Sequence, residues 1–456
     1  MKKVLDHGSA MEGFVAGSKV LVVGLGATGL SCVRYLVGRG LDVVVTDSRE
    51  LPPGLNELSK NFPAVPVYPG RFVPELFKDA EQIVVSPGVA LQEPLITDAR
   101  CRNVVVVGDI ELFARAARAP VIAITGSNGK STVTSLVAHM ADQEGREIRV
   151  GGNLGTPALD LLQDVEPDLY VLELSSFQLE STFNLRAQAA VVLNVSADHM
   201  DRYRSVTEYA AAKARIYNNA KVQVVNTDDP LAKSLAEPGI TTVQFGVQDS
   251  DQLDYGLGMH NGDEWLTHNN EELMQASELR LAGRHNLSNA LAALALGACA
   301  GLPMQHMLRT LRSFEGLPHR MQWVAEQDGI CWYNDSKATN IGATVAAITG
   351  MDRPVVLIAG GDAKGADFEP LRQALGDRVR AVVVLGRDAL KIRDALQSIV
   401  CVVNAGDIEE AVTQAARLAR AGDAVLLSPA CASFDMFSGY EERGQVFMEA
   451  VRCHLA

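Results

Sequence analysis

The chain has 456 residues, enough for about three domains that each bury a core of their own. Hydrophobic residues make up 47% and charged residues 21%, which is ordinary for a globular protein. The net charge of −14 gives no general affinity for nucleic acid or for an anionic membrane surface. Anionic substrates therefore have to be bound by local basic groups and backbone N–H groups.

Redox and targeting features favour the cytoplasm. The seven cysteines are dispersed and form no C-x-x-C pair, which is typical of reduced thiols in a cytosolic protein. No apolar run approaches the ~20 residues that cross a bilayer. Asp6, His7 and Glu12 interrupt any signal-peptide core. We therefore expect a cytoplasmic protein without membrane insertion, whose irregular residues 1–18 form a tail.

The first predicted unit opens with a nucleotide-binding pattern. A strand-like run ends in Gly24-Leu-Gly-Ala-Thr-Gly29, a helical pattern follows, and a second strand-like run ends in Asp47-Ser-Arg49. This is G-x-G-x-x-G between a strand and a helix, with Asp47 placed 18 positions beyond Gly29. The glycines permit a tight turn and a close approach of pyrophosphate, so a nicotinamide oxidoreductase is a real alternative at this point.

Alternating strands and helices in the same unit predict a parallel sheet. Residues 83–85 form a strand-like run that ends in Ser86-Pro-Gly, and residues 104–107 form another. Ligands of such sheets bind beyond the carboxyl ends of the strands, where Gly24, Asp47 and Ser86 fall. Ser86 is either a ligand contact or part of a plain turn.

The second unit contains a phosphate-binding loop. An apolar run leads into Thr125-Gly-Ser-Asn-Gly-Lys-Ser131, and a helical pattern follows. Glycines let backbone N–H groups converge on phosphate, and the start of the helix adds partial positive charge. Lys130 would reach the terminal phosphates and Ser131 would hold a magnesium ion. Where a Walker A loop has its first glycine this chain has Ile124, so the loop is a shorter form, which we expect to bind ATP.

Other polar positions in this unit are open to two interpretations each. Glu173 is the last residue of a strand that looks buried. Its side chain is either directed at a magnesium ion or exposed to solvent. His199, within Asp-His-x-Asp, suits metal or phosphate chemistry but is alone more often structural. Lys213 lies among alanines of a helical pattern, which by itself indicates a solvated surface charge. The polar, short-patterned residues 241–282 predict small strands and hairpins. Asn289 lies on the first turn of the next predicted helix, where it either faces nucleotide or caps the helix.

The third unit begins after a Gly/Pro turn near residues 314–318. Three strand–glycine–helix repeats predict another parallel sheet. Lys337 and Lys364 lie in polar loops at the ends of such strands. Together with Arg320 they either bind carboxylates or phosphates or are ordinary exposed charges.

Five motifs follow one another in order. They are Thr125-Gly-Ser-Asn-Gly-Lys-Ser-Thr132, Glu173-Leu-Ser-Ser-Phe-Gln178, the segment from Asn194 to His199, Gly283-Arg-His-Asn-Leu-Ser-Asn289 and His319-Arg320. Their order and spacing resemble those of the Mur ligases, the ATP-dependent amino-acid ligases of peptidoglycan precursor synthesis, across essentially the whole chain from Lys19. Asn334-Asp-Ser-Lys-Ala-Thr-Asn340 and Ser428-Pro-Ala-Cys-Ala-Ser433 are similar to the members that add D-glutamate.

The resemblance implies an α/β fold of three domains. Residues 1–108 would form a Rossmann-like sheet for the UDP substrate, residues 109–316 a P-loop NTPase-like domain for ATP, and residues 317–456 a Rossmann-like sheet for the amino acid. It implies a monomer whose substrates are UDP-N-acetylmuramoyl-L-alanine, D-glutamate and ATP, with two magnesium ions. The implied reaction passes through an acyl phosphate, over which the third domain closes by hinging near residues 316–318.

The resemblance also implies roles for individual residues. The ATP contacts would be Gly126, Ser127, Asn128, Gly129, Lys130, Ser131, Thr132, Asn289, Arg320 and Asp335. The UDP-substrate contacts would be Gly24, Gly26, Thr28, Asp47, Ser48, Arg49, Ser86, Asn153 and Gln178. The D-glutamate contacts would be Lys337, Thr339, Lys364, Ser433, Phe434 and Tyr440. The catalytic residues would be Lys130, Glu173, His199 and Lys213, and the magnesium ligands Ser131, Glu173, His199 and Lys213. Lys213 would be carbamylated, because a carbamate turns a cation into a metal-binding carboxylate.

Three other classes make different predictions. A nicotinamide dehydrogenase would transfer hydride without ATP. A P-loop switch protein would need the guanine-reading tetrapeptide Asn-Lys-x-Asp, which the sequence lacks. A folylpolyglutamate synthetase shares the P-loop and the second half, but it lacks a UDP-type N-terminal sheet and would add L-glutamate to folate.

Overall fold

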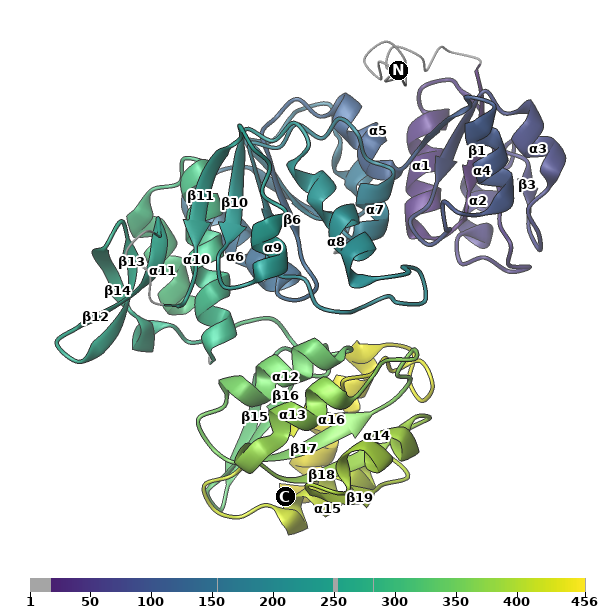
Figure 1. Cartoon of the computed structure of the whole chain (residues 1–456). Coiled ribbons are helices and arrows are strands. Elements are labelled where there is room, and N and C mark those ends of the chain that lie inside the picture. Colours follow the sequence, from purple (N-terminus) through teal and green to yellow (C-terminus); the bar gives the residue numbers. More distant parts are fainter. Residues whose placement is uncertain (1–17, 154, 249–252, 282, 456) are drawn as a thin grey trace.

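The computed structural model describes residues 18–153, 155–248, 253–281 and 283–455. Of the predicted tail, residues 1–18, all but Ser18 lie outside the described residues. The chain forms three α/β units, each built on its own sheet, and the central unit lies between the other two (Figure 1). The predicted three-unit α/β fold class is confirmed, whereas the domain boundaries at 108/109 and 316/317 stay predictions.

The N-terminal unit is a parallel sheet of five strands in the order β3-β2-β1-β4-β5. The strands are β1 (Lys19–Val23), β2 (Asp42–Thr46), β3 (Val67–Tyr68), β4 (Gln82–Val85) and β5 (Val105–Val107). The helices are α1 (Ala27–Val37), α2 (Leu55–Asn61), α3 (Pro74–Asp79) and α4 (Pro94–Cys101). The valine-rich strands are buried nearly throughout, because helices cover both faces of a parallel sheet. The last strand begins one residue later than the predicted 104–107.

The central unit is a nine-stranded sheet in the order β14-β13-β12-β11-β10-β9-β6-β8-β7. The strands are β6 (Val121–Thr125), β7 (Ile148–Gly152), β8 (Leu169–Glu173), β9 (Ala189–Val192), β10 (Val222–Asn226), β11 (Thr241–Phe245), β12 (Tyr255–His260), β13 (Asp263–His268) and β14 (Glu271–Gln275). Strands β6 to β11 pair in parallel, whereas β12, β13 and β14 form antiparallel hairpins. The short strands predicted for residues 241–282 are therefore confirmed.

Helices surround the parallel part of the central sheet. They are α5 (Asp109–Ala116), α6 (Lys130–Gln143), α7 (Ser176–Glu180), α8 (Val206–Ala214), α9 (Pro230–Ser234), α10 (Arg284–Cys299) and α11 (Met304–Ser313). Short 3₁₀ segments are η2 (Ala158–Leu161), η3 (Arg215–Tyr217) and η4 (Ala276–Glu278). The helix predicted near Lys213 is thus α8, which tightens into η3 at its end. The apolar side chains of α6 and α10 share one buried cluster with the strands beneath them.

The C-terminal unit has a six-stranded sheet in the order β15-β16-β20-β17-β18-β19. The strands are β15 (Gln322–Gln327), β16 (Ile330–Asn334), β17 (Val355–Gly360), β18 (Val379–Leu385), β19 (Cys401–Asn404) and β20 (Ala424–Leu427). The helices are α12 (Ile341–Gly350), α13 (Glu369–Leu375), α14 (Ala389–Leu396), α15 (Ile408–Leu418) and α16 (Tyr440–Leu455), with the 3₁₀ segment η5 (Gly376–Arg378). The predicted parallel sheet is confirmed, and only β15 runs antiparallel to its neighbour in it.

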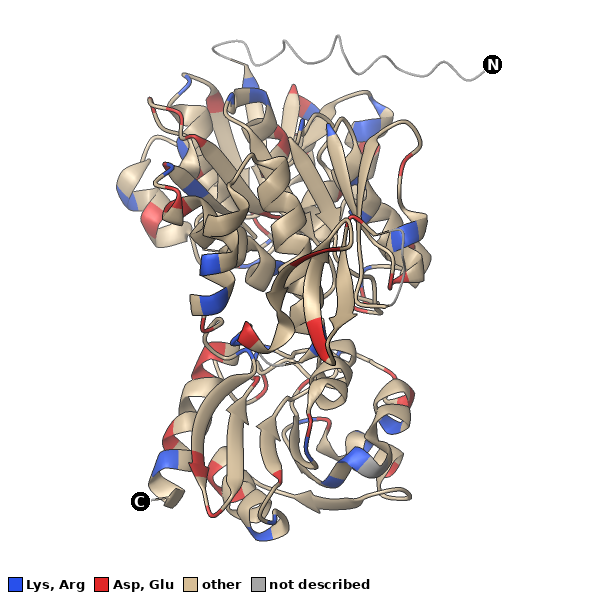
Figure 2. Cartoon of the chain, turned by 90° about the vertical axis from the view of Figure 1, so that its left-hand side faces the viewer, with Lys and Arg blue, Asp and Glu red and all other residues tan. Residues whose placement is uncertain are grey.

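The topology decides where the polar loops meet. Strands β6, β8 and β9 are parallel neighbours, so their carboxyl ends lie at one edge of the central sheet. The arrows of β10 and β11 point toward the C-terminal unit in Figure 1, so this edge faces that unit. On the face shown in Figure 2, acidic and basic residues are interspersed over the upper and lower parts. Within the described ranges, no helix has both the length and the apolar character to cross a membrane.

Candidate active site

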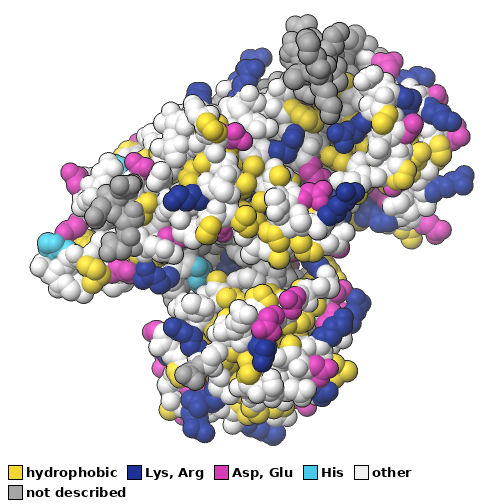
Figure 3. Space-filling model, viewed as in Figure 1, with side chains coloured by type: hydrophobic (Ala, Val, Ile, Leu, Met, Phe, Trp, Pro, Cys, Tyr) yellow, Lys and Arg dark blue, Asp and Glu magenta, His cyan; other side chains and the backbone are white. Residues whose placement is uncertain are grey.

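A cavity of about 470 Å³ opens between the central and C-terminal units. Its wall includes the phosphate loop, the carboxyl ends of β8 and β9, the start of α10, and loops of the C-terminal unit around Asp335 and Lys364. In the space-filling view this is the recess between the upper part of the molecule and the lower unit (Figure 3). Asn128 of the phosphate loop and Asn340 of the C-terminal unit, 212 residues apart in sequence, therefore line the same cavity.

The phosphate loop joins β6 to α6 and has the predicted geometry. Gly129 adopts φ +82°, and a Cβ there would come within 2.5 Å of the Asn289 side-chain oxygen. Only glycine suits this position, because the backbone is left-handed and α10 approaches it closely. The side chain of Lys130 folds back on the loop and donates to the carbonyls of Gly126 at 2.8 Å and Ser127 at 2.9 Å. Burial lowers the pKa of Lys130.

Asn194, just after the neighbouring strand β9, stabilises the phosphate loop by hydrogen bonds to Asn128. Its side-chain oxygen accepts the Asn128 N–H at 2.8 Å, and its amide donates to the Asn128 carbonyl at 3.1 Å. Ser127 is tied in the same way, because its hydroxyl donates to the Ser196 carbonyl at 3.0 Å and accepts the Ser196 N–H at 3.0 Å. The loop between β6 and α6 is therefore fixed by the segment that follows β9 before any phosphate binds.

Glu173 is the buried acid that the sequence placed at a strand end. Its side chain is 3% exposed, and Oε1 accepts the Asn153 amide at 2.7 Å. Oε2 is buried and has no hydrogen-bond partner among the described residues. A buried carboxylate oxygen without a partner is costly, and a cation is the ligand that would satisfy it. Of the two interpretations, the solvated acid is therefore wrong.

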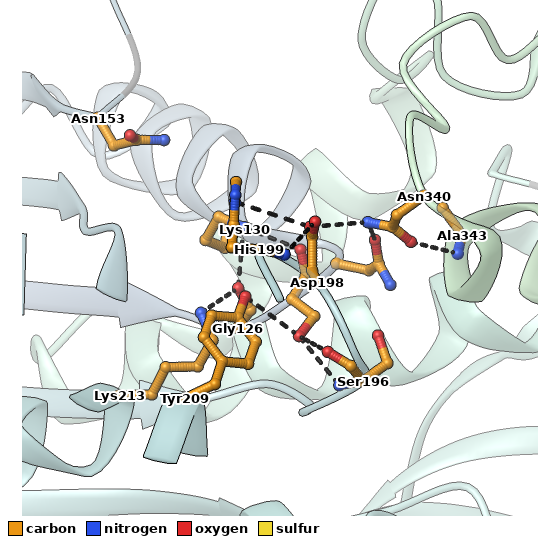
Figure 4. A network of polar contacts seen from close by, with 12 residues as sticks. Gly126, Lys130, Asn153, Ser196, Asp198, His199, Tyr209, Lys213, Asn340 and Ala343 are labelled. Carbon is orange, nitrogen blue, oxygen red and sulfur yellow. Dashed lines mark hydrogen bonds and ion pairs between the residues drawn. The ribbon is translucent and has the colours of Figure 1, made fainter. Parts of the chain in front are cut away.

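Lys213 is not the surface charge that its helical pattern indicated. It is 1% exposed, its Nζ donates to the Gly126 carbonyl at 2.8 Å, and it lies 4.4 Å from the centroid of the Tyr209 ring. Burial, reinforced by the nearby charge of Lys130, lowers its pKa well below the ordinary lysine value. Figure 4 shows Lys213 and Lys130 converging on the same carbonyl. The pattern failed because α8 turns this face toward the phosphate loop.

His199 and Asp198 lie on the other side of the loop (Figure 4). His199 has a left-handed backbone with φ +57°, and its Nε2 is 3.8 Å from the Asp198 carboxylate. Its ring meets the Phe177 ring edge-on with centroids 4.9 Å apart. Burial lowers the pKa of His199, so the neutral ring, which can accept a metal, is favoured.

Asn340 joins the C-terminal unit to this centre. Its amide donates to Asn128 Oδ1 at 3.2 Å and to Asp198 Oδ2 at 3.2 Å, while its own Oδ1 accepts the Ala343 N–H at 2.9 Å and caps α12. Figure 4 shows these contacts. Asp198 belongs to the Asp-His-x-Asp segment that was expected to suit metal or phosphate chemistry, whereas no individual role was predicted for Asn340, Asn194 or Ser196. For Asn340, the signal that was available is an asparagine immediately before a helix.

Arg320 and Asp335 complete the central part of the cavity. Arg320 donates from a terminal nitrogen to the Ser131 hydroxyl at 3.0 Å, which links the C-terminal unit to the phosphate loop a second time. Asp335 accepts the Ser428 hydroxyl at 2.9 Å and the Met321 N–H at 3.2 Å. Burial raises the pKa of Asp335 to about 7. Asn289 lies beside Gly129 and donates to Asn286 at 3.1 Å.

The candidate D-glutamate residues divide into two groups. Lys337, Thr339 and Lys364 line the cavity. The Lys337 ammonium lies 3.6 Å from the centroid of the Tyr440 ring, and burial lowers its pKa to about 8. Ser433, which is 2% exposed, Phe434, which is 74% exposed, and Tyr440 form the second group, and none of these three lines the cavity.

The candidate UDP-substrate residues of the first unit gather at the carboxyl edge of its sheet, outside the cavity. They are Gly24, Gly26, Thr28, Asp47, Ser48, Arg49 and Ser86. Asp47 is buried and accepts the Leu25 N–H at 2.7 Å and the Arg49 guanidinium at 2.7 Å. Ser86 donates to the Gly24 carbonyl at 2.7 Å. Asp47 and Ser86 therefore stabilise the glycine turn by hydrogen bonds to its backbone.

The two other candidate UDP-substrate residues lie in the central unit. Asn153 lines the cavity beside Glu173. Gln178 is 2% exposed and forms a capping box with Ser175 at the start of α7, while its amide donates to Asp109 at 3.0 Å. These contacts give Gln178 a structural role here in place of a position on the cavity wall, where a UDP-substrate contact was expected.

Comparisons with known proteins place the whole chain in one family. The model of the Mur ligase MurD-like N-terminal domain matches residues 18–108, that of the Mur ligase middle domain residues 124–297, and that of the Mur ligase glutamate ligase domain residues 319–431. The chain belongs to the Mur ligase family. Three family models in the expected order account for most of its length.

Curated Mur ligases are similar along nearly the entire chain. A UDP-N-acetylmuramoylalanine–D-glutamate ligase of Nitrosococcus oceani is 54% identical over 96% of this chain and 97% of its own length. The ligase of the same name from Marinobacter nauticus is 52% identical over 97% and 99%. The ligase of that name from Pseudomonas savastanoi pv. phaseolicola is 53% identical over 95% and 97%.

Solved structures support the Mur ligase fold. A pseudomurein peptide ligase type C from Methanothermus fervidus superposes with a TM-score of 0.62 at 19% identity, covering 95% of this chain and 100% of the other. UDP-N-acetylmuramate-alanine ligase MurC from Thermotoga maritima gives 0.59 at 20% identity, covering 96% and 99%. At these identities the likeness concerns the fold alone.

Proposed function

We propose that this Mur ligase joins D-glutamate to UDP-N-acetylmuramoyl-L-alanine with ATP, releasing ADP and phosphate, as a step of peptidoglycan precursor synthesis. The observation that carries the proposal is the identity of 52–54% over nearly the full length with ligases named for this reaction. The cavity supports it, because one wall presents a phosphate loop and the facing wall presents Lys337 and Lys364, two cations suited to an amino-acid carboxylate.

The phosphate loop supplies binding and charge neutralisation. The backbone of residues 126–132 and the N-terminus of α6 would receive the phosphates, as helix starts do. Lys130 would leave the two loop carbonyls it now contacts and turn its ammonium to the terminal phosphate. Arg320, which already contacts Ser131, would add a second cation from the opposite unit.

The residues present fit a magnesium ion, with one condition. The partnerless Oε2 of Glu173 is the donor that a cation would satisfy, and Ser131 and His199 offer an oxygen and a neutral nitrogen nearby on the same wall. Among the described residues, however, no group of three or more His, Cys, Asp and Glu could hold a metal. We infer that Lys213 provides the missing anion as a carbamate. When bound, magnesium would neutralise charge on the transferring phosphoryl group.

The environment of Lys213 suits carbamate formation. Its lowered pKa favours the neutral amine, and a neutral amine attacks CO₂ and then releases a proton to form the carbamate. The Gly126 carbonyl that now accepts the Lys213 N–H marks where the new group would lie, beside the loop. A bare ammonium at the same place would repel a metal ion.

The chain's own residues would serve the two chemical steps mainly by positioning. The L-alanyl carboxylate attacks the γ-phosphorus and forms an acyl phosphate, and the D-glutamate amine then attacks that carbonyl carbon and expels phosphate. Lys337, Thr339 and Lys364 would hold the glutamate carboxylates, with Ser433, Phe434 and Tyr440 nearby. The contacts of Asn340 and Arg320 would keep the two units together and exclude water from the acyl phosphate.

The UDP group would bind at the carboxyl edge of the N-terminal sheet, over the turn that Asp47 and Ser86 shape. We further propose that the protein acts as a monomer in the cytoplasm, where its seven cysteines stay reduced, as all seven are free in the structure.

The deciding experiment compares D-glutamate with L-glutamate, each with UDP-N-acetylmuramoyl-L-alanine and ATP, and measures ADP release and the amide product. We expect turnover with D-glutamate alone. Turnover with L-glutamate alone would overturn the proposed amino acid. Hydride transfer to or from a nicotinamide cofactor without ATP would overturn the ligase assignment itself.

A further inference from the structure

A second cavity, of about 500 Å³, lies on the central unit away from the phosphate loop. Its wall is built from most residues between Ala114 at the end of α5 and Val121 at the start of β6, from most residues between Asn184 and Gln188 before β9, and from Lys221 before β10. The amino ends of β6 and β9 therefore meet here, at the edge opposite the active site. Because β6 is five residues long, about 15 Å of strand separates the two cavities.

The wall of this cavity is strongly basic. It contains Arg115, Arg118, Arg186 and Lys221 and no aspartate or glutamate. The chain as a whole has a net charge of −14, so this wall has the opposite charge to the rest of the molecule. Arg118, Arg186 and Lys221 are exposed, and in the part of the chain that the structure describes no ion pair engages any of the three.

Buried contacts hold the two sides of the cavity together. Arg115 is 15% exposed, and its Nε donates to Glu111 at 3.1 Å. Glu111, which is fully buried behind the wall, also accepts the N–H groups of Phe183 at 2.8 Å and Asn184 at 2.9 Å. The Glu111 carboxylate thus ties α5 to the segment before β9. The backbone of the wall is therefore fixed around Arg115, and Arg118, Arg186 and Lys221 are exposed side chains on that wall.

The remaining wall is apolar or neutral. Ala114, Ala117, Pro120 and Leu185 form surface between the cations, and Gln188 is held by the Lys221 ammonium at 3.0 Å. The volume is in the range of small-molecule sites, which combine apolar surface with a few convergent polar groups. Arginine forks match phosphate oxygens in pairs, and none of the described residues that line the cavity offers a carboxylate to a cationic ligand.

We propose that this cavity binds a phosphorylated small molecule, with the phosphate between Arg118, Arg186 and Lys221 and the uncharged part against Ala117 and Pro120. The phosphate could belong to a nucleotide or to a sugar phosphate, which share this chemistry. The site is separate from the reaction centre, because none of its residues lines the active-site cavity.

The test is calorimetric titration of the full chain and of Arg118→Glu/Arg186→Glu with inorganic pyrophosphate. The phosphate loop and the N-terminal glycine turn are the same in both, so we expect the wild type to show one further binding event, which the variant weakens by roughly tenfold or more. Titration with AMP and with glucose 6-phosphate then distinguishes the two phosphate sources. The experiment does not depend on ligase activity, so it stands or falls apart from the proposed reaction.

The matched control is Lys233→Glu/Arg309→Glu, which changes the net charge equally at two exposed positions outside the cavity. The proposal is overturned if no further event occurs, if the cavity variant retains it, or if the control loses as much affinity. Thermal melting verifies that each variant is folded. Arg118→Gln/Arg186→Gln, a milder change, replaces the reversal should that variant not fold.

Discussion

At the scale of single residues, the active site depends on charged side chains that are buried. Lys130 and Lys213 both contact the Gly126 carbonyl, and Glu173 lies buried beside them. Two ammonium groups so close repel each other, and this is part of why the pKa of Lys213 is lowered. A triphosphate beside Lys130 and a carbamate on Lys213 would each remove that repulsion, so these charges suit what the site is proposed to bind.

Replacement of Lys130 tests this charge. Lys130→Ala should lower turnover by roughly 1000-fold, because one preorganised donor to a developing phosphate charge is worth about that much. Binding of the UDP substrate, measured by calorimetry, should be unchanged, since Lys130 is remote from the N-terminal sheet. Lys233→Ala, at an exposed helix position, serves as control and should keep full activity. ADP release at a near-normal rate by Lys130→Ala would contradict the assignment.

Asp109 offers a residue-scale test of stability. It is fully buried at the start of α5, one oxygen accepts from Gln178 at 3.0 Å, and burial raises its pKa to about 6. Its folded-state pKa thus exceeds the unfolded value near 4, so its contribution to stability is present below pH ~4 and is lost as pH rises through about 6.

Asp109→Asn should therefore raise the free energy of unfolding at pH 8 by something on the order of 2 kcal/mol, and the gain should vanish toward pH 4. Thermal melting across this range measures it. Asp42→Asn, an exposed change of the same kind, should show no comparable gain. A gain for Asp109→Asn that does not depend on pH would rule out the linkage argument.

At the scale of elements, the active site depends on how closely α10 approaches the turn between β6 and α6. Gly129→Ala should weaken ATP binding by roughly 100-fold or more, because the new Cβ adds a left-handed strain and collides with Asn289 at 2.5 Å. Gly145→Ala is the matched control. Its φ is +76°, but a Cβ there meets nothing within 4 Å, so it should cost only about 1 kcal/mol of stability. Nucleotide titration and thermal melting of both variants distinguish backbone strain, which both share, from the collision with Asn289, which only Gly129→Ala has. Equal ATP affinities of the two variants would contradict the predicted collision.

At the scale of the whole molecule, the active site exists only when the central and C-terminal units meet. Asn340 both caps α12 and bonds across to Asn128 and Asp198. Asn340→Asp separates the two tasks, because a carboxylate still caps the helix but cannot donate and would face the Asp198 carboxylate.

We expect Asn340→Asp to keep its melting temperature and to lose about 10- to 100-fold in kcat/KM, through misplaced units. Asn340→Ala loses the cap as well and should also lower stability by about 1 kcal/mol. Steady-state kinetics and melting distinguish the pair. Wild-type kcat/KM in Asn340→Asp would mean that these contacts do not position the units.

The sequence by itself determined the fold class, the phosphate loop and the place of the acid at the end of β8. These follow from local patterns: valine runs, glycines at fixed spacing and polar residues at strand ends. Tertiary structure decided the rest. The burial of Lys213, the bond between Gln178 and Asp109 and the bridge made by Asn340 arise from packing between segments far apart along the chain. A local pattern fixes which way a helix face points only relative to its own axis, so only the packed molecule decides what that face meets.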